Sequence, residues 1–241
     1  MKRRALLIGY TGADSNEDTL EGVLFDLEKY KNYLMSPRGG AWENDEIIVL
    51  NAPTKSKLKI QLLLAKADGI DMMFTVFSGH GDFDDVEKGC RRFLLNKDEI
   101  IWEKDLWNIA KKQILICDSC AGLRSRNANE SLLEEKRVSN IIKTSSNERL
   151  LARKKYDTWC YECENQLIRL YAAKAGTYAE DQEGGVYTNC LIDVLEHSEK
   201  SISIMAAHDR AKPIVELRTN GQKPTKQCLK VMKFLPGAIV I

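Results

Sequence analysis

The sequence lacks the features that would assign a protein to a membrane or nucleic-acid-binding class. No apolar run approaches the roughly 20 residues that cross a bilayer, and the run behind the basic start, residues 5–8, is too short for a signal peptide. The formal net charge of +1 leaves no basic excess for nucleic acid. We therefore expect a cytoplasmic protein that binds neither a membrane nor nucleic acid.

The cysteines are too irregular for a disulfide framework. There are seven, an odd number without regular spacing, which fits a reducing compartment. Cys160 and Cys163 form one isolated CxxC pair, and neither a second pair nor a nearby histidine pair completes the roughly four ligands of a zinc site. We expect two unconnected thiols in a loop and no bound metal.

The first half of the chain alternates between patterns typical of strands and of helices, and the sequence contains no internal repeat. Strands are expected at residues 4–9, 45–50, 72–77 and 114–117, and helices at 15–34, 54–68 and 103–112. Such alternation predicts a mainly parallel sheet with helices on both faces.

The first two expected helices show the caps and apolar stripes of sheet-packing helices. Ser15 and Thr54 are the expected N-caps. The stripes comprise Leu20, Val23, Leu24, Leu27 and Leu34 in the first helix, and Leu58, Leu62 and Ala65 in the second. Asp26 lies off the first stripe, and its spacing alone indicates a solvated carboxylate on the helix flank.

The periodicity is lost after Gly122. Residues 123–168 are rich in charge and polar residues and contain no clear strand, although 131–138 and 147–155 are good helix formers. A strandless segment of this length in a compact domain indicates a functional role, mobility or both. Beyond it we expect a strand at 167–173, a helix capped by Thr188, a helix at 202–212, a strand at 213–217 and a docked apolar end at 234–241.

Two expected strands lead directly into reactive side chains. Residues 72–77 precede Ser-Gly-His-Gly, which contains His80, and residues 114–117 precede Asp-Ser-Cys-Ala-Gly, which contains Cys120. The carboxyl ends of parallel strands face the crevice where open α/β sheets bind ligands. A thiol and an imidazole there are the pair that a thiolate nucleophile with a general base requires.

These motifs, in this order and spacing, resemble those of caspase-like cysteine peptidases, particularly metacaspases and paracaspases. The resemblance selects Cys120 over Cys117, because the family places one residue between the nucleophile and a glycine. The chain departs from caspases proper, which have Gln-Ala-Cys, and from many metacaspases, which have His where Ala121 stands. Residues 172–195 and the Gln-Lys-Pro at 222–224 resemble the small catalytic portion of the family.

The resemblance implies a three-layer α/β/α sandwich with a central sheet of about six strands. It also implies one domain over residues 1–241, with a large-subunit-like part at 1–122, a linker and activation segment at 123–168, and a small-subunit-like part at 169–241.

The implied activity is hydrolysis of a peptide bond through a thioester. His80 is the expected general base and leaving-group acid, because an imidazole pKa near 6.5 allows both roles near neutrality. The backbone N–H groups of Gly81 and Cys120 are the implied oxyanion hole. The remaining histidines, His197 and His208, lie on expected helices and are assigned surface or core positions.

The resemblance also implies a specificity. Asp26, Ser78 and Asp118 match the positions that hold a basic side chain in metacaspases and paracaspases, and Asp181 is a further candidate for this pocket. Carboxylates in a partly desolvated pocket favour arginine or lysine over aspartate. We therefore expect protein substrates to be cleaved after Arg or Lys.

The linker contains basic residues that such an enzyme would itself recognise. We expect activating cleavage of a zymogen, by the enzyme or by a partner protease, at Lys136, Arg137, Arg149, Arg153, Lys154 or Lys155. The acidic residues 82–87 could attract calcium, although a solvated loop is the commoner explanation and the spacing is not that of an EF-hand. No other cofactor is expected.

Two alternatives stay open. One is a catalytically inactive caspase-like scaffold or regulator, against which the presence of both Cys120 and His80 argues. The other is a different α/β hydrolase or a flavodoxin-like binding domain, which lacks support because no Gly-rich phosphate loop follows the first strand. By association with relatives, a stress or antiviral role on a companion protein is a further expectation.

Overall fold

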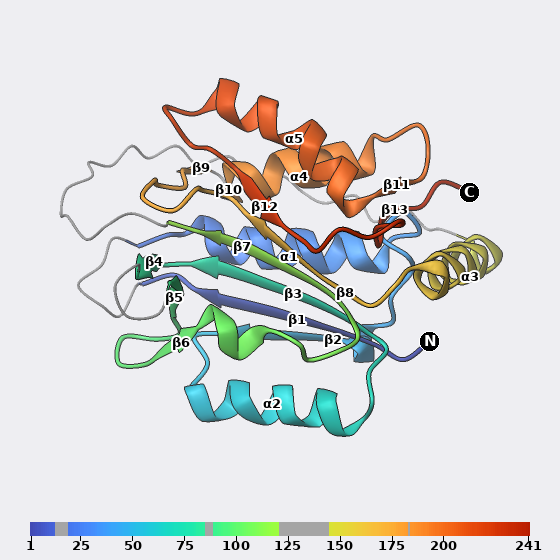
Figure 1. The fold of residues 1–241 in the computed structure, drawn as a ribbon, viewed down its shortest axis with the longest axis horizontal. Helices are drawn as coiled ribbons and strands as arrows, with labels where there is room; N and C mark the ends of the chain where they lie inside the picture. The colour runs from blue at the N-terminus through green and yellow to red at the C-terminus, as the bar shows by residue number, and fades with distance from the viewer. Residues whose placement is uncertain (13–18, 85–88, 121–144, 183) are drawn as a thin grey trace.

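The computed structural model describes residues 1–12, 19–84, 89–120, 145–182 and 184–241. A six-stranded sheet in the order β12-β8-β7-β3-β1-β2 forms its centre (Figure 1). Its strands are β1 (Arg3–Tyr10), β2 (Ile47–Asn51), β3 (Met72–Gly79), β7 (Lys112–Ser119), β8 (Gln166–Tyr171) and β12 (Thr225–Gln227). All neighbours are parallel except β12, which runs antiparallel to β8. The expected mainly parallel sheet is confirmed.

Helices cover both faces of this sheet, so the expected three-layer sandwich is also confirmed (Figure 1). One face packs against α1 (Gly22–Met35), α3 (Ser146–Glu162), α4 (Val186–Glu196) and α5 (Ile204–Arg218). The other face packs against α2 (Lys55–Ala67), the small sheet β4 (Gly81–Asp84), β5 (Cys90–Leu94) and β6 (Ile100–Trp102), and the 3-10 helix η2 (Glu103–Leu106). Shorter elements are η1 (Asn44–Glu46), β9 (Asp181–Gln182), β10 (Gly184–Gly185), β11 (Ile202–Ser203) and β13 (Pro236–Ala238).

Local sequence signals explain several of these elements. All eight residues of β3 are buried, as expected for a parallel strand covered on both faces. The Thr54 hydroxyl accepts a hydrogen bond from the Lys57 N–H at 3.2 Å and caps α2, whose Leu58, Leu62 and Ala65 are buried as predicted. The C-terminal end is docked, because Leu235, Ala238 and Ile239 are buried and β13 pairs with β11.

The prediction of a helix at residues 103–112 is wrong. Only the short η2 forms, and Asn108 takes a left-handed backbone conformation with φ 55° that ends helical continuation. The buried Gln113 side chain replaces the helical hydrogen bonds: its carbonyl accepts from the Ile109 N–H at 3.0 Å, and its amide donates to the Leu106 carbonyl at 2.6 Å. A side chain from the following strand therefore decides the conformation of this segment.

The strand expected at residues 213–217 is also wrong, because α5 continues through Pro213 to Arg218. Ala207, Ala211 and Val215 recur every four residues and are buried, so one continuous helical face enters the core. This burial outweighs the hydrogen bond that proline removes. The last strand of the central sheet is β12 instead.

Two smaller expectations need correction, and two more lie outside the described residues. Helix α3 occupies much of the segment expected to be irregular; it confirms the helix at 147–155 and extends it to Glu162. Cys160 and Cys163 end this helix and do not lie in a loop. The expected Ser15 cap and the helix at 131–138 lie outside the described residues. No helix in the described part of the chain is both long and apolar enough to cross a bilayer.

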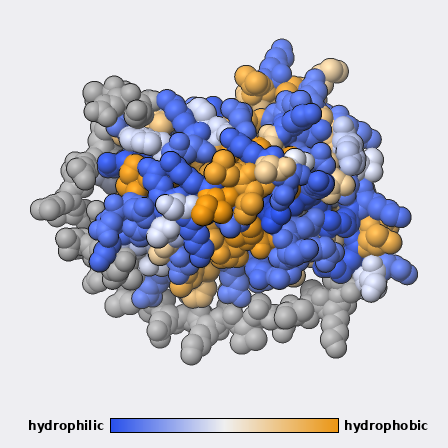
Figure 2. All heavy atoms as spheres, turned by 90° about the horizontal axis from the view of Figure 1, so that it is seen from below, coloured by the Kyte–Doolittle hydropathy of each residue, from blue (hydrophilic) through white to orange (hydrophobic). Residues whose placement is uncertain are grey.

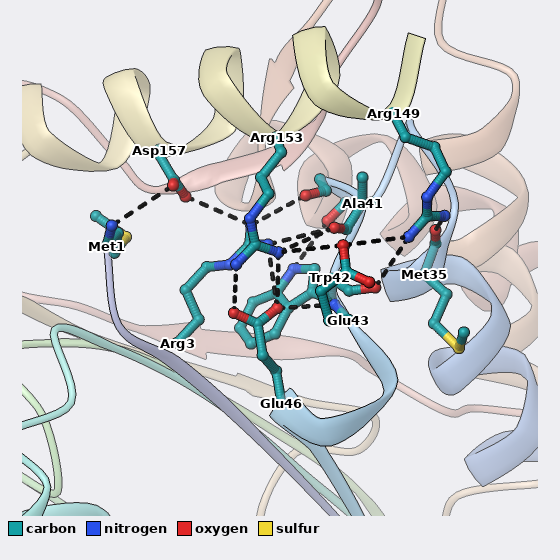
Figure 3. Close-up of polar contacts among 12 residues, drawn as sticks. Met1, Arg3, Met35, Ala41, Trp42, Glu43, Glu46, Arg149, Arg153 and Asp157 are labelled. Carbon is teal, nitrogen blue, oxygen red and sulfur yellow. Dashed lines mark hydrogen bonds and ion pairs between the residues drawn. The ribbon is translucent and has the colours of Figure 1, made fainter. Parts of the chain in front are cut away.

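A buried ion network attaches α3 to the start of β1 and to η1 (Figure 3). Glu46 accepts hydrogen bonds from Arg3 at 3.2 Å and from Arg153 at 2.6 Å and 2.9 Å. The Arg3 side chain is fully buried, also faces Asp157 at 3.4 Å, and its guanidinium lies 4.7 Å from the centre of the Trp42 ring. Burial alone would raise the pKa of Glu46, but these arginines and the Glu43 N–H hold it below its usual value.

Glu46→Gln is expected to lower the free energy of unfolding by about 3 kcal/mol, because it leaves the buried Arg3 guanidinium without its full complement of charge. The Glu46 pKa is depressed in the fold, so its contribution is present above the unfolded pKa and is lost as the pH falls. Urea unfolding at pH 7 and pH 3 measures both effects, and the difference in stability between the two proteins should be smaller at pH 3 than at pH 7.

Glu43→Gln is the matched control, since Glu43 is 57% exposed and its contacts with Arg149 and Arg153 are longer, at 3.7 Å and 4.0 Å. Glu43→Gln should lower the free energy of unfolding by less than about 1 kcal/mol. If Glu46→Gln and Glu43→Gln lowered the free energy of unfolding equally, Glu46 would have no special role in attaching α3.

Candidate active site

His80 and Cys120 leave neighbouring strands at the same edge of the sheet. β3 and β7 pair in parallel, and the register places Gly79 opposite Ser119, so the next residue of each strand is His80 and Cys120 respectively. The two side chains predicted to form the dyad therefore follow adjacent hydrogen-bonded strand ends, at the carboxyl edge where α/β sheets place ligands.

Gly79 shapes the backbone that carries His80. Its φ is 141°, which side chains other than that of glycine rarely permit, and a Cβ at this position would lie 2.5 Å from the Tyr10 carbonyl oxygen. The Tyr10 ring then meets the imidazole of His80 edge to face, with 6.4 Å between ring centres. Strand β1 thus positions the histidine from one side.

Gly81 lies against the strand end that carries the thiol. It starts β4, and a Cβ on it would approach the Ser119 hydroxyl to 3.1 Å and the Arg92 carbonyl to 3.0 Å. A larger residue would push this backbone away from Cys120. Because Gly81 has no side chain, its backbone lies close to the end of β7. A backbone N–H in this place can donate to the oxygen of a carbonyl that the thiol attacks.

Cys120 is a half-buried thiol in this structure. Its Sγ lies 3.5 Å from the Ala179 carbonyl, which the S–H can reach as a donor. Burial raises the pKa of the Cys120 thiol above its usual value. The group is therefore protonated at neutral pH and needs a base before it can act as a nucleophile.

Asp26 is buried, so the interpretation from its helical spacing as a solvated carboxylate is wrong. It is 1% exposed, whereas Leu24, assigned to the buried stripe, is 49% exposed. The Asp26 carboxyl accepts hydrogen bonds from the Ser78 hydroxyl at 2.7 Å and from the Gly185 N–H at 3.0 Å. The flank of α1 that carries Asp26 faces β10 and the end of β3, not water.

Asp118 accepts its hydrogen bonds from Thr188, the residue expected to cap a helix. The Thr188 hydroxyl and N–H donate to the same Asp118 oxygen at 2.6 Å and 3.0 Å. Thr188 is thus not the N-cap of α4; Gly185 precedes that helix, and Thr188 sits in its first turn. The available signal is a threonine three residues after Gly184-Gly185, but it points to a helix cap as readily as to a tertiary contact.

The acidic positions Asp26, Asp118 and Asp181 meet Ser78 and Cys120 around one pocket. The volume of this pocket is about 30 Å³. The lining residues are Leu20, Val23, Asp26, Ser78, Gly79, Asp118, Ser119, Cys120, Ala179, Glu180, Asp181 and Gly185. Within the described residues this lining contains no lysine or arginine.

Burial and nearby negative charge raise the pKa of all three carboxyl groups. Burial is the largest cause for each: it raises the pKa of Asp118 to about 6, that of Asp26 well above its usual value, and that of Asp181 in the same direction. The negative charge of Asp118 acts further on Asp26, and that of Asp181 on both. A cation in the pocket would relieve this repulsion, so the site is chemically suited to a basic side chain.

The acidic segment 82–87 is only partly described. Asp82 accepts a hydrogen bond from the Arg92 Nε at 3.0 Å and forms an ion pair with the same guanidinium. Residues 85–87 lie outside the described residues. Elsewhere, the described part of the chain has no group of three or more His, Cys, Asp or Glu residues placed to hold a metal ion.

Four of the six expected cleavage positions lie in a folded helix. Arg149, Arg153, Lys154 and Lys155 belong to α3, where Arg149 donates to the Met35 carbonyl at 2.6 Å and Arg153 binds Glu46 (Figure 3). Proteases cut exposed, flexible segments, so the structure argues against cleavage at these four positions. Lys136 and Arg137 lie outside the described residues.

Comparison with known proteins assigns the family. A model of the caspase domain matches residues 2–235. The chain belongs to the caspase-domain family. Among solved structures, the crystal structure of caspase-1 from Spodoptera frugiperda has the same fold, with a TM-score of 0.61 and 12% identity over 94% of this chain and 86% of that chain. No curated protein matches the sequence.

This assignment confirms the resemblance drawn from the two motifs. The caspase-domain chain is a caspase-like cysteine endopeptidase, and its substrates are proteins.

Proposed function

We propose that this caspase-domain protein cleaves peptide bonds after arginine or lysine. The observation that carries the proposal is the convergence of Asp26, Asp118 and Asp181 on the pocket beside Cys120, with no basic side chain in the described lining. A guanidinium or ammonium entering this pocket would exchange repulsion between carboxyl groups for charge-assisted hydrogen bonds. An aspartate side chain would add a further negative charge and be excluded.

In the proposed reaction, His80 removes the proton from the Cys120 thiol, and the thiolate attacks the carbonyl carbon of the substrate. The N–H groups of Gly81 and Cys120 stabilise the oxyanion that forms. Collapse of this intermediate breaks the C–N bond, and His80 donates its proton to the departing amine. A water molecule then attacks the thioester, releasing the carboxylic acid and restoring the thiol.

We further propose that the described conformation is latent. The pocket, with a volume of about 30 Å³, leaves little room for an arginine side chain. The Ala179 carbonyl also occupies the donor of Cys120, so this hydrogen bond has to break before the thiol can give its proton to His80. Cleavage at Lys136 or Arg137, or a partner protein, would supply this change.

We also propose a cellular compartment and a biological role for the protease. All seven cysteines are free, which suits the reducing cytoplasm, and a stress or antiviral response would use a latent protease of this kind.

The proposal is tested with fluorogenic peptides that end in Arg, Lys, Asn or Asp, with and without calcium. They are incubated with the wild type and with Cys120→Ala, before and after limited trypsin treatment. Trypsin is removed on an inhibitor resin before the assay, because trypsin itself cleaves after Arg and Lys. Release after Arg and Lys is expected to exceed release after Asp by about 100-fold, the scale of one buried charge interaction. Preferential release after Asp would refute the pocket assignment. Silence in all conditions, with Cys120 still reactive toward iodoacetamide, would favour the inactive scaffold.

A further inference from the structure

The outward face of α2 bears a stripe of apolar side chains. The helix buries Leu58, Leu62 and Ala65 beneath the sheet, yet Ile60, Leu63 and Leu64, on its opposite side, are 54%, 65% and 50% exposed. Figure 2, which views the molecule from the α2 side, shows an apolar area framed by hydrophilic residues. Contiguous exposed aliphatic side chains of this kind mark interaction surfaces in otherwise polar proteins.

Positive charge borders this stripe. Lys57, Lys59 and Lys66 are exposed, and α2 contains no carboxylate. The acid that follows the helix, Asp68, forms an ion pair with Arg4. The apolar stripe therefore lies in a positive environment, which favours a partner with negative charge around an apolar centre.

The spacing of these residues matches the contact seam of a helix pair. Ile60, Leu63 and Ala67 recur at intervals of three and four, as the a and d positions of a heptad do. In that register Lys57 falls at an e position, and Lys59 and Lys66 fall at g positions. These are the positions that pair with opposite charges on a partner helix, so a seam bordered by glutamate or aspartate would be complementary.

We propose that α2 docks an amphipathic helix of a partner protein whose apolar seam is bordered by acidic residues. A second copy of α2 fits poorly, because the two sets of lysines would face each other. The surface lies on the face of the sheet opposite to α1, which contributes Val23 and Asp26 to the acidic pocket. Helix α2 contributes nothing to that pocket. Docking thus leaves the active site open, as required for recruiting a substrate or a regulator.

The test uses two synthetic helical peptides with the same leucine seam, one with glutamate and one with lysine at the flanking positions. Binding of each to the intact protein is measured by fluorescence anisotropy at low and high salt. The wild type should prefer the acidic peptide by about 10-fold or more, and salt should reduce this preference. Leu63→Ser should weaken binding by about 10-fold, as removal of a central anchor does.

A charge reversal separates docking from a structural effect. The triple variant Lys57→Glu, Lys59→Glu and Lys66→Glu should prefer the lysine peptide instead. Leu217→Ser is the matched control, because Leu217 is an 86% exposed leucine on α5, and this variant should bind like the wild type. Peptidase activity after Arg should be unchanged in all these variants.

Three outcomes would overturn the proposal. Equal affinity for the two peptides would mean that the lysines select nothing. Binding to phosphatidylserine vesicles without binding to the acidic peptide would assign the stripe to a membrane surface. Dimerisation of the wild type that Leu63→Ser abolishes would show that a second copy covers the stripe.

Discussion

Cys120→Ala is expected to abolish peptide hydrolysis, with a fall in kcat of about 10⁴-fold or more, because no other group can form the thioester. The structure places Cys120 at the end of β7, beside the acidic pocket and in line with His80 across the β3–β7 pair. Single-turnover assays with an arginine peptide on trypsin-treated protein measure this loss, and circular dichroism checks that the variant folds.

Cys117→Ala is the matched control, three residues earlier on the same strand. Cys117 is fully buried in the core on the α2 face, and burial raises its pKa well above the usual value, so it cannot supply a thiolate. This variant should lose about 1 kcal/mol of stability from the small cavity and keep its kcat. If Cys117→Ala were inactive while Cys120→Ala still turned over substrate, the nucleophile would be misassigned.

The central sheet could be predicted because its signals are local. The apolar runs that became β3 and β7 are continuous and buried on both faces, and each is followed directly by glycine or polar residues. The same local pattern placed His80 and Cys120 at strand ends, and parallel pairing then brought those ends together. The dyad could thus be proposed before any long-range contact was known.

The acidic pocket could not be derived from periodicity, because its walls come from distant parts of the chain. Asp26 is buried by Ser78 and Gly185, which are 52 and 159 residues away in sequence. A helical pattern describes only the helix itself, so it assigned Asp26 to solvent and Leu24 to the core. Only the resemblance to the caspase-like family pointed to the pocket.

The failed helix at 103–112 and the failed strand at 213–217 have the same origin. Propensity favoured a helix before β7, but the Gln113 side chain took over the hydrogen bonds at Leu106 and Ile109. Pro213 suggested a break, but the buried Val215 kept α5 intact. In both segments a tertiary interaction outweighed a local preference of about 1 to 3 kcal/mol.

Asp118→Asn is expected to weaken the enzyme and stabilise the fold through the same lost charge. Removing a carboxylate that faces the substrate cation should lower kcat/KM for arginine peptides by about 100-fold and change cleavage after Asn much less. Assays of both peptides at pH 7.5, with the exposed Asp98→Asn as control, measure this difference. Equal losses for arginine and asparagine peptides would show that Asp118 positions Cys120 and does not select the substrate.

The stability effect of Asp118→Asn should depend on pH with a definite sign. The Asp118 pKa is raised in the fold to about 6, so its favourable contribution is complete below its unfolded pKa and is lost as the pH rises through about 6. The variant should match the wild type near pH 4 and exceed it at pH 8, by at most about 3 kcal/mol for two pKa units. The Thr188 hydroxyl and N–H would donate to a neutral amide oxygen in place of a carboxylate, and these weaker hydrogen bonds reduce the gain. Urea unfolding across that range measures the change, and destabilisation by the same amount at every pH would mean that the Asp118–Thr188 hydrogen bonds outweigh the cost of burying the charge.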